Sequence, residues 1–325
     1  MSGAPPLTRA REFFAVLIAW LFVSITAVAA DSQVCEAALT DTARNDRIVP
    51  VRIRLPAGDA SVPLVIFSHG LGGSLDAGTR WAQAWTRAGI AVIHVQHAGS
   101  DESLWRGRAQ PDIGSALRGA MSAEQLLARL DDVAFVLDRV ERDKTLGECS
   151  LQRLDRNRIG VAGHSFGAHT ALGVAGQRLP IAVQPRGAAD PRVRAAIAFS
   201  PAPPVSGKDA DAFGNIVMPV LSITGTEDGD PPLIASVRSL TPADRERPYK
   251  AMRPGSKYLL VLDGADHMVF SGNVQRRRAN DNDERVSGIV EDVTTRFWKS
   301  TLFVDPPDLL QPPKMLSPRD RWQTK

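Results

Sequence analysis

Short apolar runs alternate along the chain with longer segments whose apolar residues recur three or four positions apart. The runs have the length of strands buried on both faces, and the longer segments have the spacing of amphipathic helices. Strands are predicted over residues 62–68, 90–95, 158–162, 193–199, 219–224 and 258–262. Strands alternating with helices predict an α/β fold with a mostly parallel central sheet and helices on both faces.

The clearest helix is predicted over residues 121–140, because its leucines and valines recur at helical spacing with Asp and Arg between them. Further helices are predicted over 81–89, 168–177 and 286–302. Alternating polar and apolar residues over 46–55 predict an early antiparallel strand or hairpin arm. Residues 97–119 lack such periodicity and contain Gly, Pro and Ser, so we expect a long loop of the kind that lines functional sites.

The beginning of the chain has the pattern of an export signal. Arg9 and Arg11 precede an uncharged apolar run over 13–23, and small residues follow as far as Ala30. A basic region, an apolar region and a small-residue cleavage site are typical of a secretory signal peptide. We therefore expect residues 1–30 to be removed and the protein to be periplasmic or secreted. Without cleavage, the apolar stretch is almost long enough to anchor the protein in a membrane.

Residues 31–304 are predicted to form a single domain, since neither a repeat nor an internal boundary is visible. The extension over 305–325 contains five prolines and is expected to be loosely packed. The two cysteines, Cys35 and Cys149, can oxidise in an exported protein and would then tie the mature N-terminus to the connector before the strand at 158–162. The sequence leaves open whether the two thiols meet.

The composition excludes few classes of protein. Of the 325 residues, 43% are hydrophobic and 23% are charged, which is ordinary for a globular protein. The net charge is +3, and the one short basic run, at 276–278, suits a solvated loop, so no nucleic-acid partner is expected. The oligomeric state is not indicated.

The leading candidate for chemistry is the pentapeptide Gly-His-Ser-Phe-Gly at residues 163–167. An apolar run precedes it and a segment rich in Ala and Leu follows, so the serine stands where a strand turns sharply into a helix. In that context G-x-S-x-G forms a nucleophile elbow, which exposes the serine hydroxyl above the sheet edge. The two glycines leave room for the neighbouring backbone. Ser165 is therefore the predicted nucleophile.

A serine hydroxyl needs a base to accept its proton, and six histidines compete for that task. His267 follows the last predicted strand, on a loop at the same sheet edge as Ser165, and is the predicted base. His97 stands at the end of a strand, where it would line the pocket, and His69 opens a glycine-rich loop that it would support by hydrogen bonding.

The base in turn needs a carboxylate that fixes its tautomer and stabilises the imidazolium. Asp228 follows the strand at 219–224, and the chain order Ser, Asp, His is that of a known triad arrangement. Glu227 and Asp230 are rival acids within two residues. A calcium loop at this acidic turn would need further ligand positions that are absent, so no metal is expected.

The negative charge that develops on the carbonyl oxygen requires N–H donors that are already in place. One predicted donor is Phe166, the residue after the nucleophile. The other is expected from the glycine-rich loop at 69–73, with Leu71 as the favoured donor and Gly70 as the alternative. The aromatic candidates for the wall of the acyl pocket are Trp105, Phe199 and Phe270.

At this point the chain resembles a known family. The similarity is carried by His-Gly-Leu-Gly-Gly-Ser at 69–74, His-Ala-Gly-Ser at 97–100 and Gly-His-Ser-Phe-Gly at 163–167. These motifs are similar to those of the α/β-hydrolases related to platelet-activating-factor acetylhydrolase and of the bacterial predicted dienelactone hydrolases. The resemblance covers roughly residues 45–300.

The resemblance implies an α/β-hydrolase fold with only short cap insertions and a serine-dependent hydrolysis of esters. In that family the loop leucine and the residue after the serine supply the oxyanion amides, which matches Leu71 and Phe166. Dienelactone hydrolases proper use a cysteine nucleophile, whereas this chain has Ser165.

The leading hypothesis is an exported serine carboxylesterase that uses no cofactor and acts on a small-molecule or lipid-like ester. The insertion over 201–218 is too short for a large lid, which argues against a lipase of long triglycerides. A serine peptidase or amidase with the same triad is one alternative. A non-catalytic binding protein on a hydrolase scaffold is the other, although such a protein would normally have lost a triad member.

Overall fold

The structure is a computed structural model of the chain. It describes residues 1, 3, 32–179, 189–231, 239–273, 281–303 and 311–325. The chain divides into two units, Met1–Ala30 and Asp31–Lys325, and the predicted signal peptide lies almost wholly outside the described residues. None of the described helices is both long and apolar enough to cross a membrane.

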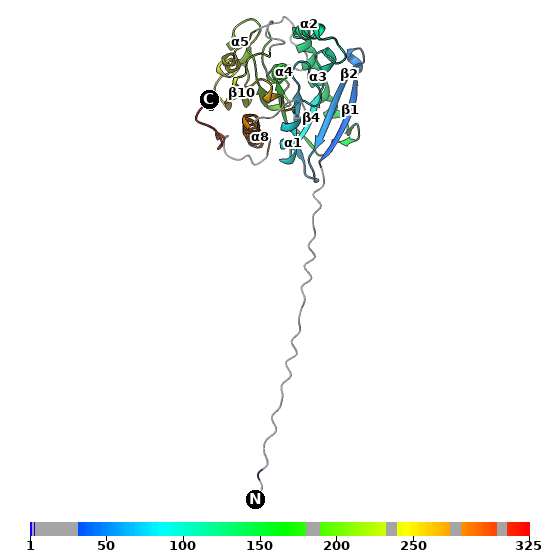
Figure 1. The fold of residues 1–325 in the computed structure, drawn as a ribbon. Helices are drawn as coiled ribbons and strands as arrows, with labels where there is room; N and C mark the ends of the chain where they lie inside the picture. The colour runs from blue at the N-terminus through cyan, green and yellow to red at the C-terminus, as the bar shows by residue number, and fades with distance from the viewer. Residues whose placement is uncertain (2, 4–31, 180–188, 232–238, 274–280, 304–310) are drawn as a thin grey trace. The chain divides into compact units, whose positions relative to one another are not determined.

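The second unit is built around one nine-stranded sheet (Figure 1). Its strands lie in the order β1 (Gln33–Asp41), β2 (Arg47–Leu55), β4 (Ala91–Val95), β3 (Val62–Ser68), β7 (Leu154–His164), β8 (Val193–Phe199), β9 (Val220–Glu227), β10 (Lys257–Asp266) and β11 (Arg321–Thr324). Neighbouring strands from β4 to β10 are parallel. The pairs at the edges, β1 with β2, β2 with β4 and β10 with β11, are antiparallel. The predicted mostly parallel sheet is therefore confirmed.

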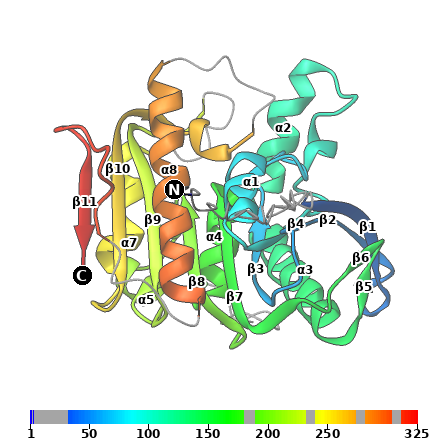
Figure 2. The ribbon, with the colours of Figure 1, turned by 90° about the horizontal axis from the view of Figure 1, so that it is seen from below.

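Helices cover both faces of the sheet (Figure 2). One face packs against α1 (Thr79–Arg87) and α8 (Asp281–Leu302), and the other against α3 (Ala123–Arg142), α4 (Phe166–Val174) and α5 (Asp209–Phe213). The remaining elements are α2 (Gln110–Ala120), α7 (Arg247–Ala251), the hairpin of β5 (Thr145–Leu146) and β6 (Cys149–Ser150), and the 3₁₀ turns η1 (Thr42–Arg44), η2 (Glu102–Leu104), η3 (Pro242–Glu246) and η4 (Val269–Ser271).

The central strand β3 shows why its sequence is an unbroken apolar run. Leu64 and Ile66 belong to the core beneath α3 and α4, whereas Val65 and Phe67 belong to the core beneath α1 and α8. Successive side chains of a strand point to opposite faces, so a strand covered on both sides must be apolar at every position.

The segment expected to be a long loop, residues 97–119, instead contains η2 and most of α2. Pro111 stands in the first turn of α2, where a helix needs no N–H bond, so the proline does not exclude a helix here. The helix packs Leu117 into a small apolar cluster with Leu104 and Leu71. Because Leu117 and Leu71 share this cluster, α2 covers the loop that carries Leu71, one of the predicted oxyanion donors.

The expectation of a loosely packed extension over 305–325 is wrong for its last residues. They form β11, in which Trp322 pairs with Leu260 of β10. The Trp322 ring stacks on Tyr258 at 5.7 Å between ring centroids. The stacked ring of Trp322, the backbone pairing with β10 and the ion pair of Asp320 with Arg285 thus hold this short segment on the edge of the sheet.

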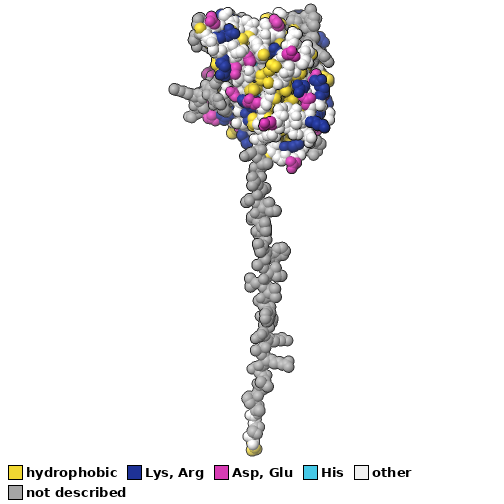
Figure 3. Space-filling model, turned by 90° about the vertical axis from the view of Figure 1, so that its right-hand side faces the viewer, with side chains coloured by type: hydrophobic (Ala, Val, Ile, Leu, Met, Phe, Trp, Pro, Cys, Tyr) yellow, Lys and Arg dark blue, Asp and Glu magenta, His cyan; other side chains and the backbone are white. Residues whose placement is uncertain are grey.

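The outer edge of the sheet at β1 carries an ion pair. Figure 3 shows basic and acidic side chains interspersed on one side of the molecule, with hydrophobic atoms between them. Arg52 of β2 pairs with Glu36 of β1 and with Asp76, each at 2.7 Å. Charged side chains on an edge strand disfavour its pairing with another chain.

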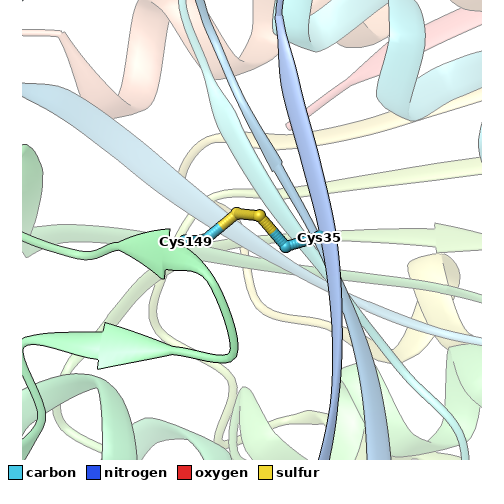
Figure 4. The surroundings of a disulfide bond; sticks show 2 residues. All are labelled: Cys35 and Cys149. Carbon is cyan, nitrogen blue, oxygen red and sulfur yellow. A yellow bond between two sulfur atoms is a disulfide. The ribbon is translucent and has the colours of Figure 1, made fainter.

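Cys35 and Cys149 form a disulfide (Figure 4). Their Cα atoms are 5.8 Å apart, and the bond joins β1 to the short strand β6. The two cysteines are 114 positions apart in the sequence, and the segment between them includes β2, β3 and β4. The link therefore closes a long loop that ends shortly before the strand leading to Ser165.

Replacing both cysteines with alanine is expected to lower the free energy of unfolding by about 4–5 kcal/mol, because the unfolded chain regains the entropy of an open loop of this length. Urea unfolding of the oxidised protein and of the variant measures the difference. A reductant should shift the midpoint of the wild-type protein and leave that of the variant unchanged. Equal midpoints for wild type and variant would contradict the prediction.

Candidate active site

The turn from β7 into α4 holds Ser165 in an unusual backbone conformation. Its φ and ψ are 56° and −115°, a region that costs a non-glycine residue about 1–3 kcal/mol. A Cβ added to Gly163 would lie 2.1 Å from the carbonyl oxygen of Gly167, and one added to Gly167 would lie 2.0 Å from that of Ser68. Only glycine fits these approaches, and they fix the sharp turn that lifts Ser165 above the sheet edge.

The structure brings Ser165, His267 and Asp228 together at the carboxyl ends of β7, β9 and β10. His267 Nε2 lies 2.9 Å from Ser165 Oγ, and His267 Nδ1 lies 2.7 Å from Asp228 Oδ1. Because a carboxylate only accepts hydrogen bonds, Nδ1 carries the proton and Nε2 is free to accept the proton of the serine hydroxyl. The geometry is that of a nucleophile, a base and an orienting acid.

Of the three candidate acids, Asp228 is the one that contacts His267. Its side chain is fully buried, and its second oxygen, Oδ2, accepts a hydrogen bond from Thr224 Oγ1 at 2.7 Å. Asp230 instead forms an ion pair with Arg245 at 2.6 Å, and Glu227 is exposed to solvent. The buried Arg245 also forms an ion pair with Asp228 at 3.5 Å.

The two predicted oxyanion donors lie on either side of Ser165. The loop after β3 carries Leu71, and a Cβ on the alternative donor Gly70 would lie 3.5 Å from that of Ser165, so the loop touches the nucleophile turn. Within the described part of the chain, the backbone N–H groups of Leu71 and Phe166 donate to no protein acceptor. Phe166 is also the first residue of α4, where the helix dipole favours negative charge.

A cavity of about 190 Å³ opens over Ser165 and His267, and most of its wall is apolar. Leu71, Ala77, Leu117, Pro231 and Met268 supply much of that wall. The expected aromatic residues do not line it. Phe199 and Phe270 are fully buried in the core beneath α1 and α8, and Trp105 Nε1 donates to Gly72 O at 2.7 Å, which braces the oxyanion loop.

His164 has a role that the sequence analysis missed. Its Nε2–H donates to the backbone carbonyl of His267 at 2.9 Å, and the two rings lie 4.8 Å apart. Burial, together with the nearby His267, holds the pKa of His164 well below its ordinary value, so the ring is neutral. The second position of the pentapeptide thus supports the backbone of the predicted base, a contact that only the fold reveals.

The prediction that His97 lines the pocket is wrong. Its ring is fully buried, with Nδ1 3.0 Å from Asp132 on α3 and Nε2 2.8 Å from the hydroxyl of Ser68. His69 supports the glycine-rich loop by hydrogen bonding, as predicted, because its Nδ1 lies 2.6 Å from Gly70 O. Its Nε2 accepts from the N–H of His97 at 3.0 Å, so the proton of His69 is on Nδ1.

The buried histidines are expected to make folding stability depend on pH. Burial lowers the pKa of His94 to about 3 and that of His97 to about 4, and it holds those of His69 and His164 well below normal. Between pH 6.5 and pH 4 the unfolded chain binds protons that the folded chain does not. The free energy of unfolding should therefore fall with falling pH, by up to about 1.4 kcal/mol per pH unit for each histidine.

Urea unfolding at pH 7.5, 6.5, 5.5 and 4.5 measures this dependence. The variant His94→Gln removes one titrating group outside the catalytic cluster. It should reduce the change in the free energy of unfolding per pH unit by the contribution of one histidine. A free energy of unfolding that stays constant from pH 7 to pH 5 would contradict the prediction.

The arrangement of sheet, nucleophile turn and surrounding helices is the α/β-hydrolase fold. A ferulic acid esterase from Streptomyces cinnamoneus is similar with a TM-score of 0.58 and 20% identity, over 90% of this chain and 96% of the other. A putative dienelactone hydrolase from Klebsiella pneumoniae subsp. pneumoniae is similar with a TM-score of 0.54 and 18% identity, over 78% and 94%. No protein-family model and no curated sequence matches the chain. The predicted fold class is confirmed.

Proposed function

We propose that this protein is an exported serine hydrolase that cleaves carboxylic esters through an acyl-enzyme intermediate. The observation that carries the proposal is the continuous hydrogen-bonded chain from Ser165 through His267 to Asp228, with distances of 2.9 and 2.7 Å, beside an open cavity. The two structural neighbours, a ferulic acid esterase and a putative dienelactone hydrolase, support the same kind of chemistry.

In the proposed mechanism Ser165 Oγ attacks the ester carbonyl carbon while His267 Nε2 accepts the hydroxyl proton. Asp228 keeps the imidazole in the required tautomer and stabilises the imidazolium. The N–H groups of Leu71 and Phe166 donate to the carbonyl oxygen as it becomes negative. His267 then protonates the leaving alcohol and later activates the water that releases the acid.

The proposed substrate is a small-molecule or lipid-like ester. The wall formed by Leu71, Leu117 and Met268 favours an apolar acyl group beside the nucleophile. The insertion over 201–218 contains α5, whose Ala212 and Phe213 are buried in the core beneath α3 and α4. These residues hold the segment to the domain, which fits an enzyme of dissolved esters better than an interface-activated lipase.

Export is part of the proposal and is supported by two independent features. The basic, apolar and small-residue regions over 1–30 have the order of a secretory signal peptide. The disulfide between Cys35 and Cys149 is of a kind that persists in oxidising compartments. Association with a membrane is proposed only for a form of the protein whose leader is not cleaved.

A fluorophosphonate probe that reacts with activated serines tests the proposal. We expect it to label the wild-type protein and not Ser165→Ala. A panel of p-nitrophenyl esters of increasing acyl length, set beside p-nitroanilide and peptide substrates, then separates an esterase from an amidase. Labelling with faster turnover of amides would favour the peptidase alternative, and an unlabelled wild-type protein would favour a binding protein.

A further inference from the structure

Arg129 on α3 is a buried cation that the proposed mechanism does not use. Its side chain is 0% exposed, and no carboxylate forms an ion pair with it within the described part of the chain. Burial lowers its pKa to about 9, so it is still charged at neutral pH. Asp132 and Asp101 are near enough to raise its pKa but form no ion pair with it, so the buried guanidinium must be held by well-placed acceptors.

The acceptors of Arg129 belong to the loop beside the nucleophile. Its Nη1 donates to His69 O at 2.7 Å, and its Nη2 lies 3.4 Å from Gly70 O. Its Nε donates to Ser100 Oγ at 2.8 Å, in the loop that follows β4. The backbone carbonyl of Ser100 in turn accepts a hydrogen bond from the N–H of Gly72 in the oxyanion loop. One side chain thus ties the oxyanion loop to α3 and to its neighbouring loop.

These contacts help to set the direction in which the candidate donors of the oxyanion loop point. In a trans peptide the C=O and the following N–H point in opposite directions. The carbonyl of Gly70 shares its peptide plane with the N–H of Leu71, and the carbonyl of His69 shares its plane with the N–H of Gly70. When both carbonyls turn toward Arg129, the N–H groups of Leu71 and Gly70 turn away from it. Arg129 therefore contributes to the orientation of both candidate donors of this loop, and at Gly70 O it acts together with His69 Nδ1 at 2.6 Å and Gly73 N–H at 3.0 Å.

The guanidinium of Arg129 also contacts the other side of the oxyanion site. Its central carbon lies 4.4 Å from the centre of the Phe166 ring, within the range of a cation–π contact. The backbone N–H of Phe166 is the second predicted donor. Arg129 is thus in contact with Phe166 and with His69 and Gly70, the residues that precede Leu71 in the oxyanion loop.

We propose that Arg129 is a positioning residue that holds the oxyanion loop and Phe166 in the geometry needed to stabilise a tetrahedral intermediate. The inference rests on the proposed serine hydrolase function. Arg129 acts through the backbone of its neighbours and need not touch the substrate.

The test compares Arg129→Lys and Arg129→Met with the wild-type protein on the p-nitrophenyl ester that it turns over fastest. Active-site titration with the fluorophosphonate probe corrects kcat for the fraction of folded protein. We expect kcat to fall about 100-fold in Arg129→Met with little change in KM, since misplacing a donor weakens an interaction made mainly in the transition state. Arg129→Lys keeps the positive charge but lacks the branched guanidinium group that donates to several acceptors at once, so its kcat should also fall.

A trifluoromethyl ketone, which binds a catalytic serine as a tetrahedral oxyanion, gives a second measurement. Its affinity should fall in parallel with kcat/KM across the variants. Arg192→Lys is the matched control, because Arg192 pairs with Asp190 at 2.6 Å before the start of β8, outside the catalytic cluster. It is expected to lower the melting temperature without changing kcat or inhibitor affinity.

The possible outcomes separate this inference from the proposed function. A wild-type protein that neither reacts with the probe nor turns over esters would overturn the proposed function. An active wild type, with titrated Arg129→Lys or Arg129→Met unchanged in kcat and in affinity for the ketone, would overturn the positioning role alone. If Arg129→Met does not fold, Arg129→Lys gives the same decision.

Discussion

Ser165→Ala is expected to abolish ester turnover, with kcat lowered on the order of 10⁶-fold, and His267→Ala should be nearly as damaging. The two side chains act as one unit, because the serine oxygen is a competent nucleophile only when His267 Nε2, 2.9 Å away, takes its proton. Steady-state kinetics of the purified variants on the fastest p-nitrophenyl ester measures both losses. The double variant should be hardly worse than either single variant.

Ser150→Ala provides the matched control, since Ser150 is exposed on β6 and should retain wild-type kcat. The chain also contains a second Ser–His–Asp arrangement, Ser68 with His97 and Asp132, at 2.8 and 3.0 Å. All three of its side chains are fully buried, so a substrate cannot reach Ser68. Turnover that survives in Ser165→Ala would remove the nucleophile assignment.

Asp228→Asn is expected to lower kcat about 10⁴-fold while leaving the fold intact. An amide nitrogen at this position would face His267 Nδ1 as a donor, so the imidazole would be driven to the tautomer with its proton on Nε2. The serine proton would then have no acceptor. The pH dependence of kcat/KM should show residual activity that rises at high pH, where hydroxide replaces the lost base.

Glu227→Gln and Asp230→Asn separate the three acids at this turn. Glu227 is exposed, and its replacement should leave kcat unchanged. Asp230→Asn removes the ion pair with Arg245, so we expect a lower melting temperature and a much smaller loss of kcat than in Asp228→Asn. A larger effect at either neighbour than at Asp228 would reassign the acid.

Most of the sheet could be predicted from the sequence because its central strands carry their own signal. β3 and β8 match their predicted ranges, since a continuous apolar run is what burial on both faces requires. β1 and β11 could not be found in this way. β1 is a half-exposed edge strand defined by its pairing with β2, and β11 is a four-residue segment defined by its pairing with β10 and by the stacked ring of Trp322.

The candidate site was predictable where a residue stands next to a sharp local signal. Ser165 lies in a pentapeptide between strand and helix, and His267 and Asp228 each follow a strand at the same sheet edge. Arg129 and Asp132 have no such signal. As charged residues in a long amphipathic helix they match a solvated face, yet both are fully buried. Contacts with loops that are distant in sequence bury them, and the spacing of apolar residues along the helix does not reveal those contacts.

The backbone at Ser165 limits how far this protein can be made heat-resistant. The φ of 56° that lifts the hydroxyl above the sheet is one that glycine adopts freely and serine does not. A glycine here would relax the main chain and at the same time delete the reactive oxygen. Selection for thermal endurance and selection for turnover therefore oppose each other at this single residue, and gains in endurance must come from elsewhere in the chain.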